Sequence, residues 1–172
     1  MKTFFIADTH FGDSAIIRYE NRPFSSVREM DETMIARWNE AVGQDDIVYV
    51  LGDFGADGRE REVLCALHGV KYLVKGNHDR KSNAEYRAFG FREVYDHPIL
   101  LDTFWILSHD AVYVNTNMPY ANLFGHVHNS PVIKDCSAQH FCVCVERIGY
   151  APIALDRIRE RIAQEVKAQT DV

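Results

Sequence analysis

Short apolar runs in this chain end repeatedly in residues that can bind metal ions. The pattern recurs in the order Asp8-Thr9-His10, Gly52-Asp53, Gly76-Asn77-His78-Asp79, His109 and Gly125-His126-Val127-His128. A short apolar run predicts a buried strand, and the carboxyl ends of neighbouring parallel strands meet at one edge of a sheet. The pattern therefore favours an α/β fold that gathers these side chains around one crevice.

The first half of the chain alternates predicted strands and helices. Buried strands are predicted at Thr3 to Ala7, Ile47 to Leu51 and Lys71 to Val74. Helices are predicted from Ser26 to Gly43 with Glu29 at capping-box spacing, from a cap at Asp57 through Glu60 to Gly69, and from about Ser82 to Phe89. The segment from Phe11 to Ser25 is predicted to be a loop. Alternation of this kind implies parallel strands joined by right-handed crossovers.

The second half reads as shorter strands followed by one helix. A hairpin is predicted from Ile99 to Leu101 and Phe104 to Ser108, with further strands at Leu123-Phe124, Val132 to Ile133 and Phe141 to Val145. Ile158, Ile162 and Val166 share one face of a final amphipathic helix. The chain shows no repeat, low-complexity segment or linker, so a single domain over residues 1–172 is expected.

Charge and composition limit the functions open to the chain. Its net charge of -6 argues against the broad basic surface that binds long nucleic acids, but not against a nucleotide substrate. No apolar run approaches the roughly 20 residues that span a bilayer, and the chain start has no signal-peptide pattern. The four cysteines lack Cys-x-x-Cys spacing, which favours free thiols. We expect a cytoplasmic protein without membrane insertion and leave its oligomeric state open.

The spacing of the ligand residues favours a site for two metals. Asp8 and His10 lie two residues apart, so their side chains share a face of an extended segment, and His126 and His128 repeat this spacing. A carboxylate such as that of Asp53 can bridge two ions if both oxygens are free. Gly52, Gly76 and Gly125 each directly precede a presumed ligand, where the missing Cβ permits unusual φ/ψ angles and close approach of the backbone to metal or phosphate.

Taken together, the five blocks resemble the signature of the calcineurin-like metallophosphoesterase family: Asp-x-His, Gly-Asp, Gly-Asn-His-Asp/Glu, His and Gly-His-x-His. They occur in that order between Thr3 and His128. The Asp-Thr-His-Phe-Gly opening, the stretch from Asn21 to Phe24 and the short length are similar to small bacterial and phage-borne members. The resemblance implies an α/β fold, a β-sandwich of two mixed sheets flanked by helices, with a binuclear metal site at the C-terminal strand ends.

The resemblance also implies a role for each motif residue. Asp8, His10 and His128 would hold the first metal, and Asn77, His109 and His126 the second, with Asp53 as the bridge. His78 would be the catalytic histidine, and Asp79 would orient its imidazole. The implied enzyme is a binuclear phosphoesterase in which a metal-bridging hydroxide attacks phosphorus. Mixed Asp, His and Asn ligands suit Mn²⁺ first, with Fe, Zn²⁺ or Ni²⁺ as alternatives.

Two carboxylates depart from the usual family pattern. Asp13 and Asp110 flank the motifs, where a carboxylate could alter the affinity for the second metal or repel a dianionic monoester. A small phosphodiester or nucleotide is therefore the favoured substrate. The loops at Phe11 to Ser25 and Asp110 to Ala121 are expected to wall the substrate cleft. Arg18, Asn21 and Arg22 could bind the phosphate or could be solvated loop residues.

Other functions and sites stay open at this point. The metallophosphoesterase family includes non-catalytic scaffolds for protein interaction. A scaffold need not keep His78, which is present here, so an enzyme is favoured. A DNA or RNA nuclease is a second alternative, although this short acidic chain has little room for basic surfaces. A zinc site at Cys136, Cys142 and Cys144 is less favoured than buried free thiols, and His68, His97 and His140 are interpreted as surface or capping residues.

Overall fold

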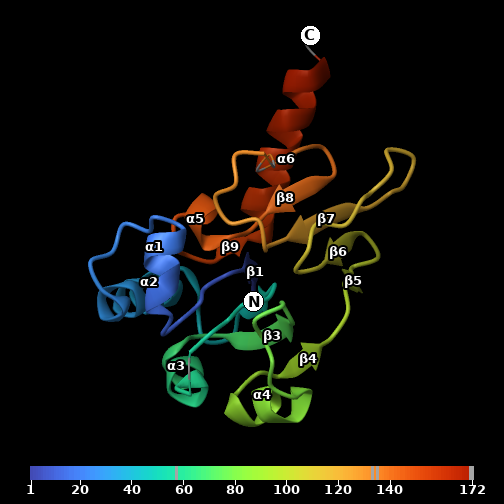
Figure 1. The fold of residues 1–172 in the computed structure, drawn as a ribbon. Coiled ribbons are helices and arrows are strands. Elements are labelled where there is room, and N and C mark those ends of the chain that lie inside the picture. The colour runs from blue at the N-terminus through green and yellow to red at the C-terminus, as the bar shows by residue number, and fades with distance from the viewer. Residues whose placement is uncertain (57, 133, 135, 171–172) are drawn as a thin grey trace.

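Two facing β-sheets form the centre of the molecule, with helices on the outside (Figure 1). The computed structural model describes residues 1–56, 58–132, 134 and 136–170. The first sheet has the order β4-β3-β2-β1-β9, and its strands are β1 (Thr3–Ile6), β2 (Ile47–Val50), β3 (Val70–Val74), β4 (Glu93–Tyr95) and β9 (Ile153–Ala154). The second has the order β5-β6-β7-β8, built from β5 (Ile99–Leu101), β6 (Trp105–Leu107), β7 (Ala121–Phe124) and β8 (His140–Cys142).

Both sheets are mixed, as predicted. Strands β1 to β4 pair in parallel while β9 runs antiparallel to β1. Strands β6 to β8 are likewise parallel, and the predicted hairpin is present as the antiparallel pair β5 and β6. The helices are α1 (Ser14–Tyr19), α2 (Val27–Ala41), α3 (Glu60–Ala66), α4 (Asn83–Phe89), α5 (Val145–Ile148) and α6 (Leu155–Thr170). The predicted fold class is therefore confirmed.

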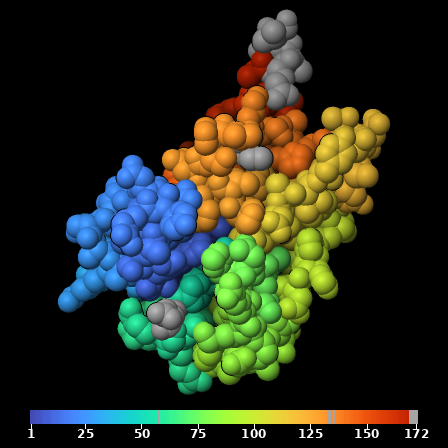
Figure 2. Space-filling view, viewed as in Figure 1, coloured from blue at the N-terminus to red at the C-terminus, as the bar shows by residue number. Residues whose placement is uncertain are grey.

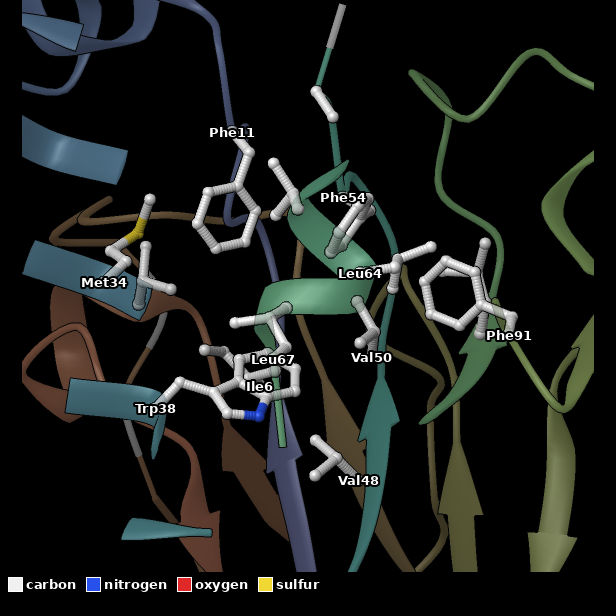
Figure 3. Packing of buried hydrophobic residues seen from close by; sticks show 14 of the residues in the cluster. Ile6, Phe11, Met34, Trp38, Val48, Val50, Phe54, Leu64, Leu67 and Phe91 are labelled. Carbon is white, nitrogen blue, oxygen red and sulfur yellow. The ribbon is translucent and has the colours of Figure 1, made fainter. Parts of the chain in front are cut away.

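Alternating residues of β1 serve two separate cores. Phe4 and Ile6 pack toward the helices, whereas Phe5 packs toward the second sheet. This follows from the two-residue period of a strand. In the helix-side core, Trp38 of α2 and Leu64 of α3 cover the sheet (Figure 3). Complete burial of side chains this large stabilises the fold by roughly 1.5–3 kcal/mol each.

Phe11 and Phe54 place the two loops after β1 and β2 against that same core. Their rings lie 5.3 Å apart and are fully buried (Figure 3). Phe11 directly follows the predicted ligand His10, and Phe54 directly follows the predicted ligand Asp53. The hydrophobic core thus anchors both ligand-bearing loops.

A backbone connection at Ala7 joins the two sheets where their parallel strands end. The Ala7 amide donates to the Val143 carbonyl at 2.9 Å, and the Val145 amide donates to the Ala7 carbonyl at 3.1 Å. The chain directly after β1 therefore lies beside the chain directly after β8. This connection brings the carboxyl ends of both sheets to one place.

The predicted helices form, and the cap expected at Ser26 is present. Ser26 caps α2 by accepting from the Glu29 amide, while the Glu29 carboxylate turns back to Ser25. Ser82 opens α4 with a complete capping box. The predicted cap of α3 at Asp57 lies outside the described residues; the residue before this helix, Arg59, makes no side-chain cap.

Several expectations for local structure were wrong. The predicted loop from Phe11 to Ser25 contains α1, which Asp13 caps by accepting from the Ala15 amide at 2.7 Å. A six-residue helix shows too few turns to reveal its period. Val132 lies in an exposed turn rather than a strand, and Ile133 is outside the described residues. Val145 begins α5 instead of ending a strand, and the short strands β4 and β9 were not predicted.

The four cysteines are free thiols, and Cys142 and Cys144 are buried among apolar residues, as the core interpretation expects. Among the helices that the structure describes, none is long and apolar enough to span a bilayer.

Candidate metal centre

The predicted ligands lie on loops at the carboxyl ends of strands from both sheets. Asp8 and His10 follow β1, Asp53 follows β2, His109 follows β6, and the loop with His126 follows β7. In Figure 2 the blue N-terminal segment, the green segment and the orange segment meet on one face of the molecule. The parallel strand order has thus gathered side chains that are more than a hundred residues apart in sequence.

One group of donors consists of Asp8, His10 and His128. A donor atom of each lies within 4.8 Å of the other two. The Asp8 Oδ1 and His128 Nε2 atoms are 3.6 Å apart, and the rings of His10 and His128 stack at 5.3 Å. These are the three residues predicted to share one metal, and the fold brings them together.

A second group shares Asp8 with Asp53 and His109, again within 4.8 Å. The Asp53 Oδ2 atom lies 3.6 Å from His10 Nε2 and 3.5 Å from His109 Nε2. Asp53 therefore stands between the two donor groups. The His109 Nδ1 is 2.9 Å from the Leu51 carbonyl, which fixes that nitrogen as the donor and leaves Nε2 facing Asp53.

Asn77 and His126 complete this second group. The Asn77 Oδ1 is 3.0 Å from His109 Nε2 and 3.1 Å from His126 Nδ1. The two imidazole nitrogens, His109 Nε2 and His126 Nδ1, are themselves 3.1 Å apart. All seven predicted ligands thus belong to one continuous cluster.

The backbone at the cluster is held in an unusual conformation. Five of the seven predicted ligands have φ between 45° and 68°: Asp8, His10, Asp53, His126 and His128. For residues other than glycine this region costs about 1–3 kcal/mol each, and it persists only where the surroundings enforce it. Here the Asp8 amide donates to the Gly52 carbonyl and the His10 amide to the Asp53 carbonyl, each at 3.0 Å. Such strain is typical of functional sites.

Glycine is required at the positions preceding Asp53 and Asn77. A Cβ on Gly76 would collide with Asp53 Oδ1, and one on Gly52 would overlap the His109 ring. The space left by each missing Cβ is therefore occupied by a neighbouring ligand side chain. The predicted close approach of the backbone to metal or phosphate stays a prediction.

Two buried donor atoms of the cluster have no hydrogen-bond partner, namely Asp8 Oδ1 and His10 Nε2. Leaving a buried polar atom unpaired costs about 1–3 kcal/mol. Burial raises the pKa of Asp8 to about 6 and lowers the pKa of His10 to about 3. His10 is therefore neutral with a free lone pair at neutral pH, which is the form that binds a metal. A divalent cation would satisfy both unpaired atoms, so the residues present fit such an ion.

His78 lies beside the cluster and borders two cavities. One, of about 490 Å³, is lined by His10, Asp13, Arg80 and Lys81 in addition to His78. The other, of about 450 Å³, is lined by residues that include His10, Asp13, His78, Tyr19 and Glu20. The segment from Phe11 to Ser14 thus helps to wall the first cavity, whereas no residue from Asp110 to Ala121 is among the described linings of either.

Asp79 does not occupy the position expected for a partner of the His78 ring. Its Oδ2 accepts from the amides of Asp53 at 2.8 Å and Gly76 at 2.9 Å, and its Oδ1 accepts from the Phe54 amide at 3.2 Å. Among the contacts of the described residues, none joins Asp79 to the His78 imidazole. The carboxylate instead holds together the loops that carry Asp53 and Asn77.

The two carboxylates that depart from the family pattern lie near the cluster. The Asp13 Oδ2 is 3.9 Å from His10 Nδ1 while its Oδ1 caps α1. The Asp110 Oδ1 is 3.5 Å from His126 Nε2, and its side chain is 77% exposed. Negative charge therefore borders both donor groups.

Sequence reasoning missed Glu146 and misjudged Arg22. Arg22 was expected on the surface or at the substrate, yet its side chain is fully buried and its Nη2 lies 2.7 Å from Glu146 Oε1. The same oxygen is 3.1 Å from His128 Nδ1. No pattern in the sequence links two residues that lie 124 positions apart. The Asn-Arg-Pro-Phe stretch drew attention to Arg22 but not to Glu146.

The fold and the cluster define a class: an α/β protein whose two mixed sheets present carboxylate, amide and imidazole donors fit for divalent metals at their carboxyl ends. The model of the calcineurin-like phosphoesterase family matches residues 1–143. The chain belongs to this family, which indicates metal-dependent hydrolysis of phosphate esters.

The chain is also similar to several individual proteins. It is 35% identical over 165 residues to the uncharacterized protein MJ1445 of Methanocaldococcus jannaschii, covering 91% of this chain and 89% of that protein. It is 32% identical over 82 residues to the gene 66 protein of Mycobacterium phage L5, a match that spans 45% of this chain and 39% of the phage protein. A crystal structure of a protein of unknown function, AQ665 from Aquifex aeolicus, shares the fold at a TM-score of 0.69 and 23% identity, covering 92% of this chain and 98% of that one.

Proposed function

We propose that this chain hydrolyses small phosphodiesters or nucleotides with two bound divalent ions, Mn²⁺ being the first choice. Asp8, His10 and His128 would hold one ion, and Asn77, His109 and His126 the other, with Asp53 between them. The observation that carries this proposal is the meeting of two donor groups at Asp53, with buried atoms of Asp8 and His10 left unpaired. Bound ions would supply Lewis-acid activation of water and neutralise charge on the phosphoryl oxygens.

The chain's own residues would position and protonate the substrate. The His78 amide donates to Asp53 Oδ1 at 2.9 Å, so this residue is tied directly to the proposed bridge. Its imidazole borders both cavities, where it can donate a proton to the leaving-group oxygen. Asp79 would act as a positioning residue, because its oxygens hold the amides of Asp53 and Gly76.

The two cavities support a diester over a monoester. They share His10, Asp13 and His78, so a phosphate placed there has room for a substituent on either side. The Asp13 carboxylate near His10 would repel the second negative charge of a monoester. Arg80 and Lys81 line only the first cavity. Lys81 is paired there with Glu60, so Arg80 would provide the positive charge for one arm of a nucleotide.

Hydrolysis of two chromogenic esters tests the proposal. Metal-free protein is reloaded with Mn²⁺, Fe²⁺, Zn²⁺ or Ni²⁺, and kcat/KM is measured for bis(nitrophenyl) phosphate and nitrophenyl phosphate. We expect turnover of both only with metal and a higher kcat/KM for the diester. A higher value for the monoester would contradict the diester assignment, and no turnover by fully loaded protein would contradict the enzymatic role.

A single domain over residues 1–172 and a cytoplasmic location stay predictions.

A further inference from the structure

A buried ion pair between Arg22 and Glu146 lies beside the cluster of proposed ligands. The Arg22 side chain is fully buried and that of Glu146 is 4% exposed. Glu146 Oε1 accepts from Arg22 Nε at 2.9 Å and from Nη2 at 2.7 Å. A buried ion pair is costly unless hydrogen bonds satisfy its remaining atoms, so its presence calls for a specific role.

Arg22 also holds the backbone that carries the first ligand. Its Nη2 donates to the Asp8 carbonyl at 2.6 Å, and its Nη1 donates to the Thr9 carbonyl at 2.9 Å. Asp8 has a φ of 58°, a conformation that its surroundings must enforce. The guanidinium thus fixes the turn on which Asp8 is presented.

Glu146 acts on the other side of the same donor group. Its Oε1 lies 3.1 Å from His128 Nδ1. A carboxylate paired with arginine can only accept hydrogen bonds, so the proton of the neutral imidazole belongs on Nδ1. The lone pair is then on Nε2, the atom 3.6 Å from Asp8 Oδ1. Glu146 therefore selects the tautomer of His128 that can bind a metal.

We propose that Arg22 and Glu146 form a positioning pair that presets Asp8 and His128 for the same metal ion. This inference rests on the proposed ligand roles of Asp8 and His128. The guanidinium is occupied by Glu146 and two backbone carbonyls, so it is not the substrate-phosphate ligand considered from the sequence. Partners of this kind typically change metal affinity 10–100-fold when they are removed.

Titration calorimetry of metal-free protein with Mn²⁺ tests the pair. Glu146→Gln removes the negative charge that Arg22 and His128 face. In this variant the affinity of one of the two ions should fall about 10–100-fold while the other changes little. Arg22→Lys should lower the same affinity, yet leave KM and inhibition by inorganic phosphate unchanged once metal is saturating. The matched control is Glu32→Gln, which removes a carboxylate from an exposed pair with Arg28. An affinity in Glu146→Gln equal to that of the wild type would overturn the inference.

Nitrogen NMR of the wild-type protein gives a readout that needs no variant and so survives if Glu146→Gln does not fold. At a pH well above the ordinary histidine value of about 6.5, metal-free His128 should carry its proton on Nδ1. A proton on Nε2 would contradict the inference. Failure of the wild-type protein to bind any of the four metals would contradict the proposed function itself. Metal binding by the wild type together with an unaffected Glu146→Gln variant would reject only the positioning pair.

Discussion

Substitution of Asp79 by asparagine tests how the ligand loops are held together. The Asp79 carboxylate accepts from the amides of Asp53, Phe54 and Gly76 at 2.8, 3.2 and 2.9 Å. Asparagine can keep its oxygen on the amides of Asp53 and Gly76, but its NH₂ group then faces the Phe54 N–H. Two buried donors would oppose each other, which costs about 1–3 kcal/mol.

Removal of the negative charge of Asp79 offsets little of the cost of the two opposed donors. Burial raises the pKa of Asp79, so the fold already disfavours the charged form relative to water. Loss of the charge alone is therefore expected to be nearly neutral, and the donor conflict dominates. We expect Asp79→Asn to lower the free energy of unfolding of the metal-free protein by about 2 kcal/mol.

Urea denaturation of metal-free protein measures this loss, with Asp96→Asn as the control. Asp96 is an exposed carboxylate paired with Lys75, so its substitution should change stability by less than about 1 kcal/mol. Because the Asp53 loop depends on Asp79, metal affinity should fall in the same variant. Unchanged stability and metal affinity with a reduced kcat would refute the reasoning and restore Asp79 as a direct partner of His78.

Three further predictions concern the cluster itself. Gly76→Ala should abolish binding of at least one ion, because its Cβ would collide with Asp53 Oδ1; full metal content by elemental analysis would contradict this. His78→Ala should keep both ions and lose about 10²–10⁴-fold in kcat, the range for a general acid, and wild-type turnover would remove His78 from catalysis. Metal affinity should fall as pH drops through about 6, because burial raises the pKa of Asp8 to about 6 and an ion must then displace a proton. His10, whose pKa burial lowers to about 3, should take no part in this loss, and a pH-independent dissociation constant would count against Asp8 as a ligand.

The sequence predicted the parts of the molecule that depend on local pattern. Strand ends at Asp8, Asp53 and Asn77 could be located because apolar runs stop there, and the parallel arrangement follows from alternating strands and helices. Ser26 and Glu29 likewise predicted the start of α2 through their capping-box spacing. These features can be recognised from residues that are neighbours in the sequence.

Features that depend on distant contacts could not be predicted. The partner of Arg22 lies 124 residues away, and only the junction of the two sheets at Ala7 brings Glu146 to it. The family resemblance implied that Asp79 orients the His78 imidazole, yet its carboxylate accepts from backbone amides of another loop. A side chain's direction depends on the tertiary structure, which the spacing of motif residues does not contain.

A crystal structure of the Mn²⁺-loaded protein, with anomalous scattering to locate the ions, tests the central claim most directly. Two peaks roughly 3.5–4 Å apart are expected on either side of Asp53. One should lie among Asp8, His10 and His128, and the other at His109. Ions bound elsewhere, or a single ion that Asp53 does not contact, would contradict the assignment of this cluster as a two-metal phosphoesterase site.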